Sequence, residues 1–500
     1  MTMRTSNTSH FGLARFGVAL VFAAAPLTAQ QPAGAGQQAP STTQMVLKGK
    51  APVSNAVLKV TLPKAKEATL PNGLRLMVLE DHRLPQVTFQ LMIPGAGGYY
   101  DPADRGGLAT WTASIMREGT TTRSSAQISE ALETMGAGLF TSAGTSSTNG
   151  EIDGSALTES LPKLMELTAD VLLHPAFAPA EWDRYKARTK PQFTQLRTNP
   201  GFLANEMFNK VVFGTHPASR VFPSAAAIDA VTVADLAEYY RTHYVPDHAV
   251  LAFAGDVTLA QARTLATKYL GDWKHAGTTP AKVTNPGPMG APKVYLVHRP
   301  NSVQTTFFVG TQGLTRTNAD YMSLTVANRV LGGVMGRLFR HLREEKGYTY
   351  GVGSGIQASP FVGAWTSNMS VRTEVTEASL RDLLAEIAEM RDKPVPAKEL
   401  ADSKRAIVAQ FALSLESPQQ MLGYSLDIWE LGLPANYWDT YPTRVSAITA
   451  EQAQTAAKKY WDPSRLQIVA VGDATKIRDI LAKFGTVEVF DSDGKPVVVP

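Results

Sequence analysis

The chain contains few groups of side chains that could bind a metal ion or catalyse a reaction. It has nine histidines and no cysteine, so any metal would need ligands from His, Asp or Glu. No two histidines have the His-x-x-x-His spacing that puts both imidazoles on one helical face. His243 and His248, on either side of Pro246, are interpreted as surface or packing residues, and "HLREE" at His341–Glu345 is typical of a charged helix face. The histidines therefore predict no metal site.

The stretch "GLATWTASIMREGT", Gly107–Thr120, is predicted to contain a helix that follows a glycine. Thr110 and Ser114 are four residues apart and share one helical face, with Ala113 beside them. Neutral hydroxyls are poor zinc ligands, and an alanine cannot act as a general base. From the residues alone, the stretch is either an ordinary packing helix or a catalytic helix without its catalytic side chains.

A second candidate region, "LGGVMGRLFRHLREEKGYTYGVGS", spans Leu331–Ser354 and contains Arg343 and Tyr350, seven residues apart. The guanidinium is a rigid fork of donors and the phenol adds another donor, so this pair is suited to hydrogen-bonding a peptide. In the competing interpretation, Arg343 caps carbonyls at the end of its own helix and Tyr350 is a half-buried strand residue. The glycines of the segment either allow a peptide to approach the backbone or form a tight turn.

Local patterns predict the elements that position these residues. "QVTFQLMI" at Gln86–Ile93 and, more weakly, "VQTTFFVG" at Val303–Gly310 alternate as half-buried strands do. "PNG" at Pro71–Gly73 predicts a hairpin turn, and a helix is expected over Tyr321–Arg343. Because strands and helices come in blocks, we expect an α+β fold with mainly antiparallel sheets packed with helices.

The two halves of the folded chain are predicted to be repeats of each other. "VTVADLAEYYRTHYVPDHAVLAFAGD" begins at Val231 and "ITAEQAQTAAKKYWDPSRLQIVAVGD" begins at Ile448, an ungapped offset of 217 residues (448 − 231). Each copy has a helix that ends at an aromatic residue and a proline, then an apolar strand and a Gly-Asp turn. The Pro- and Gly-rich segment 276–292 is predicted to link a first lobe at 64–275 to a second lobe at 293–500.

Residues 1–29 are predicted to be a secretory signal that is cleaved near Ala29, because early arginines precede the short apolar run Phe16–Ala29. The competing interpretation is a membrane anchor, but the run is shorter than the ~20 residues needed to span a bilayer. Residues 30–63 are expected to be a flexible lead-in. No other segment is apolar enough to cross a membrane, and an exported chain without cysteine fits the bacterial periplasm. The net charge of +4, without any Lys/Arg block, argues against nucleic acid as a partner.

These features together resemble the pitrilysin/insulinase-type zinc peptidases, which include the mitochondrial processing peptidases. The resemblance covers nearly all of Lys64–Pro500. In that family, the helix after Gly-Leu-Ala carries His-x-x-Glu-His and leads to a Gly-Thr. Aligned without gaps, the two histidines fall on Thr110 and Ser114, and the glutamate falls on Ala113.

The family's third zinc ligand is a glutamate about seventy-five residues downstream, on another helix. Here no acid occurs between Asp183 and Glu206, and Pro191 lies where an uninterrupted helix is expected. The resemblance thus implies a first lobe with no metal ligands and no catalytic residues. It also implies that Arg343 and Tyr350 match a family pair that binds the carbonyls of the substrate peptide.

In two-chain members of this family, one chain carries the zinc site and the other lacks it. The resemblance implies a periplasmic, non-catalytic subunit that binds peptide, with no cofactor of its own. Zinc and the general base for peptide-bond hydrolysis would come from a zinc-bearing paralogous subunit. The competing hypothesis is a catalytically inert homodimeric scaffold or peptide-binding protein of the same fold.

Overall fold

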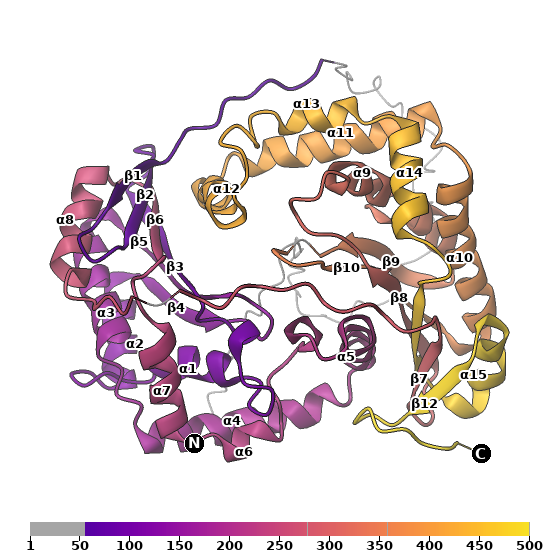
Figure 1. The fold of residues 1–500 in the computed structure, drawn as a ribbon, viewed down its shortest axis with the longest axis horizontal. Helices are drawn as coiled ribbons and strands as arrows, with labels where there is room; N and C mark the ends of the chain where they lie inside the picture. Colours follow the sequence, from indigo (N-terminus) through magenta and orange to yellow (C-terminus); the bar gives the residue numbers. More distant parts are fainter. Residues whose placement is uncertain (1–55, 278, 358, 500) are drawn as a thin grey trace, which may run out of the picture. The chain divides into compact units, whose positions relative to one another are not determined.

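The computed structural model describes residues 56–277, 279–357 and 359–499. The predicted signal, and the lead-in as far as residue 55, lie outside the described residues. The described chain forms two α+β lobes, one from each half of the sequence (Figure 1). Among the described residues, no helix combines the length and the apolar character needed to cross a membrane.

The first lobe is built on a six-stranded sheet in the order β1-β2-β6-β3-β5-β4. Its strands are β1 (Lys66–Thr69), β2 (Arg75–Glu80), β3 (Gln86–Pro94), β4 (Gly138–Ala143), β5 (Asn149–Leu157) and β6 (Val250–Gly255). Neighbouring strands are antiparallel except for the parallel pair β2 and β6. The predicted hairpin turn joins β1 to β2, and the strand predicted at Gln86–Ile93 is present as β3. Both predictions are confirmed.

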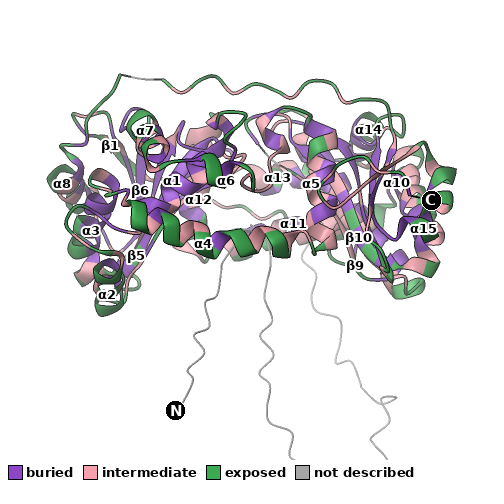
Figure 2. Cartoon of the chain, turned by 90° about the horizontal axis from the view of Figure 1, so that it is seen from below, coloured by how far each residue is buried: buried purple, intermediate pink, exposed green. Residues whose placement is uncertain are grey.

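The helices of the first half of the chain mostly pack around the apolar core of this sheet, whereas α5 (Pro200–Phe213) packs on the sheet of the second lobe. They are η2 (Gly98–Tyr100), α1 (Leu108–Met116), α2 (Ser125–Met135), η3 (Thr158–Ser160), α3 (Leu161–Leu173), α4 (Pro179–Leu196), α5 (Pro200–Phe213), η4 (Pro217–Ser219), α6 (Ala227–Ala230), α7 (Val233–His243) and α8 (Leu259–Leu270). Figure 2 shows buried residues concentrated in the strands and in the helix faces against them, while much of α4 is exposed.

The second lobe repeats this plan with a sheet in the order β12-β7-β11-β8-β10-β9. Its strands are β7 (Val294–His298), β8 (Gln304–Gln312), β9 (Thr349–Ile356), β10 (Ala364–Arg372), β11 (Gln467–Gly472) and β12 (Val487–Phe490). Its helices are α9 (Tyr321–Gly332), η5 (Phe339–Glu345), η6 (Thr373–Val375), α10 (Thr376–Asp392), α11 (Ala397–Ser414), α12 (Pro418–Leu431), α13 (Tyr441–Ala447), α14 (Ala450–Tyr460), α15 (Ala474–Leu481) and η7 (Ala482–Phe484). The pairs β8–β10, β10–β9 and β11–β8 are antiparallel, and the pairs that include β7 are parallel.

The predicted internal repeat is confirmed in the backbone. Helices α7 and α14, and strands β6 and β11, begin and end at positions exactly offset by the repeat distance seen in the sequence. Thr232 and Thr449 precede the two helices, and each closes a capping box with the residue three positions later. The same local signals therefore produce the same element boundaries in both lobes.

Each lobe also contributes one helix to the sheet of the other lobe. Helix α5 packs on β8 and β11, where the rings of Phe208 and Phe308 lie 6.0 Å apart, centroid to centroid. Helix α12 packs on β6 and β2, where Leu422 joins Val250 in a shared apolar cluster. The two lobes therefore share hydrophobic cores.

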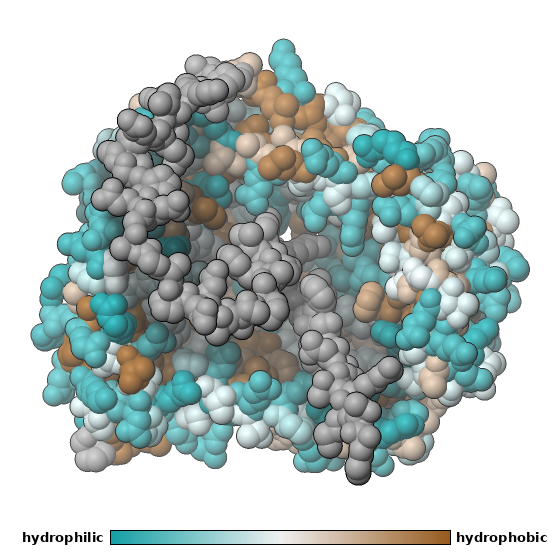
Figure 3. Space-filling model, turned by 180° about the vertical axis from the view of Figure 1, so that it is seen from behind, coloured by the Kyte–Doolittle hydropathy of each residue, from teal (hydrophilic) through white to brown (hydrophobic). Residues whose placement is uncertain are grey.

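The predicted linker at 276–292 has no helix or strand among its described residues, but it is attached to its surroundings. The backbone N–H of Thr284 donates to the Tyr99 hydroxyl at 2.9 Å, and Gln312 Nε2 donates to the Gly287 carbonyl at 2.7 Å. On the face drawn in Figure 3, the described surface is mainly hydrophilic, with hydrophobic residues in separate small groups.

The prediction of a single helix over 321–343 is wrong, because the chain forms α9 and then a separate π-helical turn, η5. Between them, Met335 has a φ of 64° and the Gly336 N–H donates to the Gly333 carbonyl. Glycines favour such a reversal because they lose the most freedom in a helix and tolerate unusual backbone angles.

The prediction that Pro191 interrupts its helix is also wrong, since α4 continues through it to Leu196. The proline removes one backbone donor and crowds the preceding turn. Packing offsets this cost, because Trp182 is buried in the same helix and its ring stacks on that of Tyr185. Tertiary packing therefore overrides the local breaker.

Candidate functional site

Helix α1 carries the residues that sequence comparison with the zinc peptidases places at the metal-binding positions. The Thr110 hydroxyl donates to the Ala143 carbonyl at 2.6 Å, and the Ser114 hydroxyl donates to the Thr110 carbonyl at 2.8 Å. Ala113 is 1% exposed and belongs to the core of the lobe. This face of α1 is therefore engaged in packing and in internal hydrogen bonds.

Helix α4 closes the space beside this face. The Tyr185 hydroxyl donates to Ser114 Oγ at 3.3 Å, and Arg188 forms an ion pair with Glu118. Zinc sites need imidazole or carboxylate ligands, whereas α1 offers two hydroxyls that are already bonded and a methyl group. The residues present do not fit Zn²⁺. Within the part of the chain that the structure describes, no group of three His, Asp or Glu side chains is arranged to hold a metal ion.

The start of α1 is anchored by Asp101. Gly107 precedes the helix with a φ of 113° and provides no side-chain cap. The Asp101 carboxyl instead accepts hydrogen bonds from the N–H groups of Gly107 (2.6 Å) and Ala109 (2.8 Å). Burial raises the pKa of Asp101 to about 6, although these hydrogen bonds and the charge of Arg220 act in the opposite direction. The helix is thus held by a buried carboxyl group with a structural role.

The histidines singled out in the sequence have ordinary roles. The ring of His243 is half-buried and stacks on Tyr239 at 4.1 Å between centroids, and burial lowers its pKa. His248 is exposed. His341 Nδ1 lies 2.7 Å from Glu386 Oε1, within a charged helix surface.

Arg343 lies in the π-helical turn η5, and its guanidinium lies over two aromatic rings. The guanidinium carbon is 4.6 Å from the centroid of Phe339 and 4.9 Å from that of Tyr350. The ion pair that Arg343 makes is with the adjacent Glu344, at 3.7 Å between Nε and Oε1. Stacking on aromatic rings leaves the N–H groups of a guanidinium able to donate to other partners.

Tyr350 is exposed by a β-bulge in β9, the strand at one edge of the second sheet. Met369 pairs with Val352 and Val371 pairs with Thr349, so Tyr350 and the glycine after it oppose a single residue of β10. Bulges of this kind redirect side chains at sheet edges. Tyr350 is 89% exposed, which rules out the alternative of a half-buried strand residue.

A polar network fixes the edge strand against α9. Asn328 Oδ1 accepts hydrogen bonds from Ser354 Oγ at 2.7 Å and from Trp365 Nε1 at 2.8 Å. At Gly332, a Cβ would lie 2.0 Å from Ser354 Oγ, so the end of α9 can approach β9 only as glycine. This glycine therefore allows the close packing of α9 on β9, a role that the sequence did not predict for the segment. Beyond it, Val334 and Met335 are exposed.

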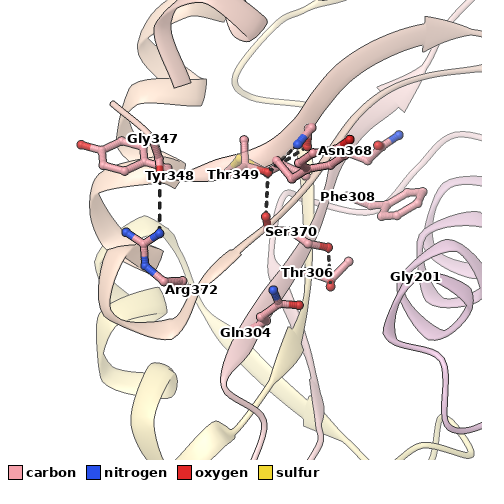
Figure 4. Close-up of a pocket in the computed structure, with 13 residues that line it drawn as sticks. Gly201, Gln304, Thr306, Phe308, Gly347, Tyr348, Thr349, Asn368, Ser370 and Arg372 are labelled. Carbon is pink, nitrogen blue, oxygen red and sulfur yellow. Dashed lines mark hydrogen bonds between the residues drawn. The ribbon is translucent and has the colours of Figure 1, made fainter. Parts of the chain in front are cut away.

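A cavity of about 660 Å³ opens beside Tyr350 on the second sheet (Figure 4). Strands β8, β9 and β10, the loop before β9 and the start of α5 line it. The lining side chains include Gln304, Thr306, Phe308, Thr349, Asn368, Ser370 and Arg372. The structure thus places Tyr350 in the wall of a cavity lined by both polar and apolar groups, and the Arg343 guanidinium lies over the Tyr350 ring.

Sequence analysis did not identify this cavity. The alternation of "VQTTFFVG" predicts a strand with one polar face, and Gln304 and Thr306 lie on that face. The residues opposite them, Arg372 and Ser370, come from β10, much later in the chain, and α5 comes from the other half. The polar face of β8 was the only sequence signal for the cavity. The other lining residues reach it through strand pairing and through the packing of α5.

The comparisons with known proteins agree with this architecture. Residues 76–221 match the family "Insulinase (Peptidase family M16)", and residues 230–407 match the "Peptidase M16 inactive domain". The chain belongs to the insulinase family of peptidases.

Relatives in sequence include an uncharacterized zinc protease of Bacillus subtilis, YmxG, which is 23% identical over 70% of this chain and 85% of its own length. Another is an uncharacterized zinc protease of Mycobacterium tuberculosis, 26% identical over 64% of this chain and 76% of its own length. Both relatives are described as zinc proteases, whereas α1 of this chain lacks the side chains that bind zinc.

Solved structures show the same fold. The peptidase M16 inactive domain from Pseudomonas fluorescens superposes with a TM-score of 0.74 at 25% identity, and covers 82% of this chain and 98% of its own. A protease from Helicobacter pylori also has a TM-score of 0.74, at 16% identity over 82% of this chain and all of its own. The protein is therefore a peptidase-like member of the insulinase family whose first lobe lacks the zinc-binding residues.

Proposed function

We propose that this chain is the non-catalytic, substrate-binding subunit of a two-chain zinc metallopeptidase that cleaves peptides in the periplasm. The zinc ion and the general base belong to a paralogous partner subunit, and this chain holds the peptide through Arg343 and Tyr350. One observation carries the proposal. Helix α1 has no group able to bind zinc or accept a proton from water, while the Tyr350 phenol, with the Arg343 guanidinium over its ring, lines a cavity.

The two donors suit an extended peptide because they recognise groups that every peptide has. Main-chain carbonyls accept hydrogen bonds from the edge of the Arg343 guanidinium and from the Tyr350 hydroxyl. Hydrogen bonds to a charged group contribute about 1.5–3 kcal/mol each. Stacking on the aromatic rings reduces the freedom that Arg343 loses when it binds.

Location in the periplasm rests on residues 1–29. Fractionation of cells that produce the full chain should recover it in the periplasm with a new N-terminus near residue 30. Recovery in the membrane fraction with residues 1–29 retained would instead support an anchor.

Metal analysis tests which of the two proposed subunits carries the zinc ion. The mature chain alone should contain much less than one zinc per molecule and should cleave no peptide. Affinity purification from the periplasm should recover a homologous chain with an intact His-x-x-Glu-His, and the pair should bind zinc and cleave peptides. One zinc per molecule in the lone chain would contradict the proposal. A zinc-free homodimer with no such partner would favour the inert scaffold.

The Arg343→Ala variant tests the binding role within that complex. Loss of one charged hydrogen-bonding group should lower kcat/KM about tenfold to a hundredfold without dissociating the subunits. Tyr350→Phe should cause a smaller loss, because it removes one neutral donor and keeps the ring that stacks on Arg343. Arg263→Ala is the matched control, since Arg263 is an exposed arginine on α8 of the first lobe. Wild-type kinetics for Arg343→Ala would remove the assigned role.

A further inference from the structure

The cavity beside Tyr350 contains groups that holding a peptide backbone does not require. Arg372 and Tyr348 lie at one end, Phe308 and Gly201 lie at the other, and the polar side chains of β8 and β10 lie between them (Figure 4). Cavities that bind side chains combine such an apolar wall with a few directed polar groups. This arrangement matches a pocket for one side chain of the peptide.

Arg372 sets the charge of the cavity. It is the only ionised side chain among the lining residues. It is exposed, and its hydrogen bond with a described residue runs from Nη1 to the Gly347 carbonyl at a long 3.4 Å. A guanidinium has five N–H donors, so most of them remain for a ligand. Among the described residues, no carboxylate lies within ion-pair distance of Arg372.

Neutral donors lie next to this charge. Thr306 Oγ1 and Ser370 Oγ are 2.9 Å apart, and whichever hydroxyl accepts in that bond keeps its own hydrogen for another partner. Gln304 and Asn368 add side-chain amides on the same side of the sheet. Gly201 belongs to the first turn of α5, the positive end of that helix's dipole. The fixed groups around the cavity thus favour a negatively charged ligand.

We propose that this cavity recognises a carboxylate of the bound peptide, with Arg372 as the contact that determines specificity. The inference rests on the proposed function, because Tyr350 borders the cavity and its partner Arg343 holds the main chain beside it. The geometry assigns the main chain to Arg343 and Tyr350, and one acidic group to Arg372. The substrates are therefore peptides with an acidic side chain, or with a terminal carboxylate, next to the segment that is held.

Peptide binding to the full mature chain tests this assignment. The probes are fluorescent ten-residue peptides, acetylated and amidated, that carry a single Glu or a single Gln at successive positions in an Ala/Thr/Val background. A second set ends in a free carboxylate in place of the amide. Anisotropy titrations compare wild type with Arg372→Gln, Arg372→Lys and the control Arg263→Gln.

At one or two adjacent positions, wild type should bind the Glu peptide about fivefold to tenfold more tightly than its Gln counterpart. Arg372→Gln should bring this ratio to about one while leaving affinity for the Gln peptide unchanged, and Arg263→Gln should preserve the ratio. A preference for free-acid over amidated peptides that disappears in Arg372→Gln would identify the terminal carboxylate as the ligand.

Other outcomes overturn the inference. Equal affinity for the Glu and Gln peptides and for both forms of the C-terminus would do so, as would a preference that survives in Arg372→Gln. The proposed function fails in a different way. In that case Arg343→Ala and Tyr350→Phe bind every peptide as tightly as wild type, whatever the charge preference. Absence of binding to any probe would overturn both.

Discussion

The two lobes share the order of most of their elements, and they differ in the backbone that follows the first α-helix of each lobe. In the first lobe, α1 is followed by α2, a regular helix that begins with a capping box at Ser124 and ends at Gly136. In the second lobe, α9 is followed by the π-helical turn η5. The next strand is an edge strand in both lobes, but β4 pairs in continuous register whereas β9 contains a bulge.

This difference decides which side chains are buried and which are exposed. Regular backbone in the first lobe directs small side chains of α1 into the core, where Ala113 is buried. Irregular backbone in the second lobe directs Arg343 and Tyr350 outward. π-Helical turns and bulges are less favourable than regular elements and recur at functional sites. The comparison shows a regular, packed region in the first lobe and an irregular, exposed one in the second, which is where the proposed function places peptide binding.

The largest expected effect comes from returning an acid to α1. Ala113→Glu should lower the free energy of unfolding by about 3 kcal/mol or more, because it buries a carboxylate without a partner in a packed core. Ser114→Ala, which removes one hydroxyl on the same helix, should cost about 1 kcal/mol. Urea denaturation measures both. A smaller loss of unfolding free energy for Ala113→Glu than for Ser114→Ala would mean that the core around α1 has room for a glutamate side chain. It would contradict the interpretation of α1 as a packing helix.

The next effect concerns how each lobe anchors its first helix. The pKa of Asp101 is raised to about 6 by burial, while the hydrogen bond from Lys459 lowers the pKa of Asp320, the residue before α9. Below its unfolded-state pKa, Asp101 is protonated in both states. As pH rises from about 4 to about 6 only the unfolded chain loses the proton, so stability falls.

The total loss from Asp101 is on the order of 3 kcal/mol. Asp101→Asn should remove this part of the pH dependence, so its stability relative to wild type should rise by that amount between pH 4 and pH 7. Asp320→Asn should change the relative stability in the opposite direction and at lower pH, because the lowered pKa of Asp320 confines its contribution to the range at and below about pH 4. Urea denaturation at several pH values measures both variants. Parallel pH profiles for wild type and Asp101→Asn would contradict the assignment.

The smallest expected effect tests the equivalence of the lobes. Thr232→Ala and Thr449→Ala each remove the capping box of an equivalent helix, and each should cost about 1 kcal/mol. Because α5 and α12 tie each lobe to the sheet of the other, both variants should shift one common unfolding transition. Two separate transitions, each sensitive to one variant, would mean that the lobes unfold independently.

Much of the fold follows from local sequence. The hairpin turn and the alternating strands are short-range signals, and the structure contains them where the sequence predicts them. The candidate site can be predicted only in part from local sequence. Arg343 and Tyr350 are found by motif, but the bulge and the stacking that set their geometry depend on pairing with β10. Local signals also mislead in two opposite ways. Pro191 predicts a break in a helix that continues, and the helix expected over 321–343 stops at the glycines after α9.

The sequence by itself determined the repeated lobes, the chemistry missing from α1 and the presence of an arginine and a tyrosine seven residues apart. These are properties of residue type and short-range spacing, which a linear chain specifies directly. Tertiary structure alone decided that α5 and α12 cross to the other lobe's sheet, that Tyr350 is exposed, and that Arg372 faces a cavity with Thr306 and Ser370. Each of these depends on contacts between residues far apart in sequence, and such contacts form only when the sheets and their shared cores assemble.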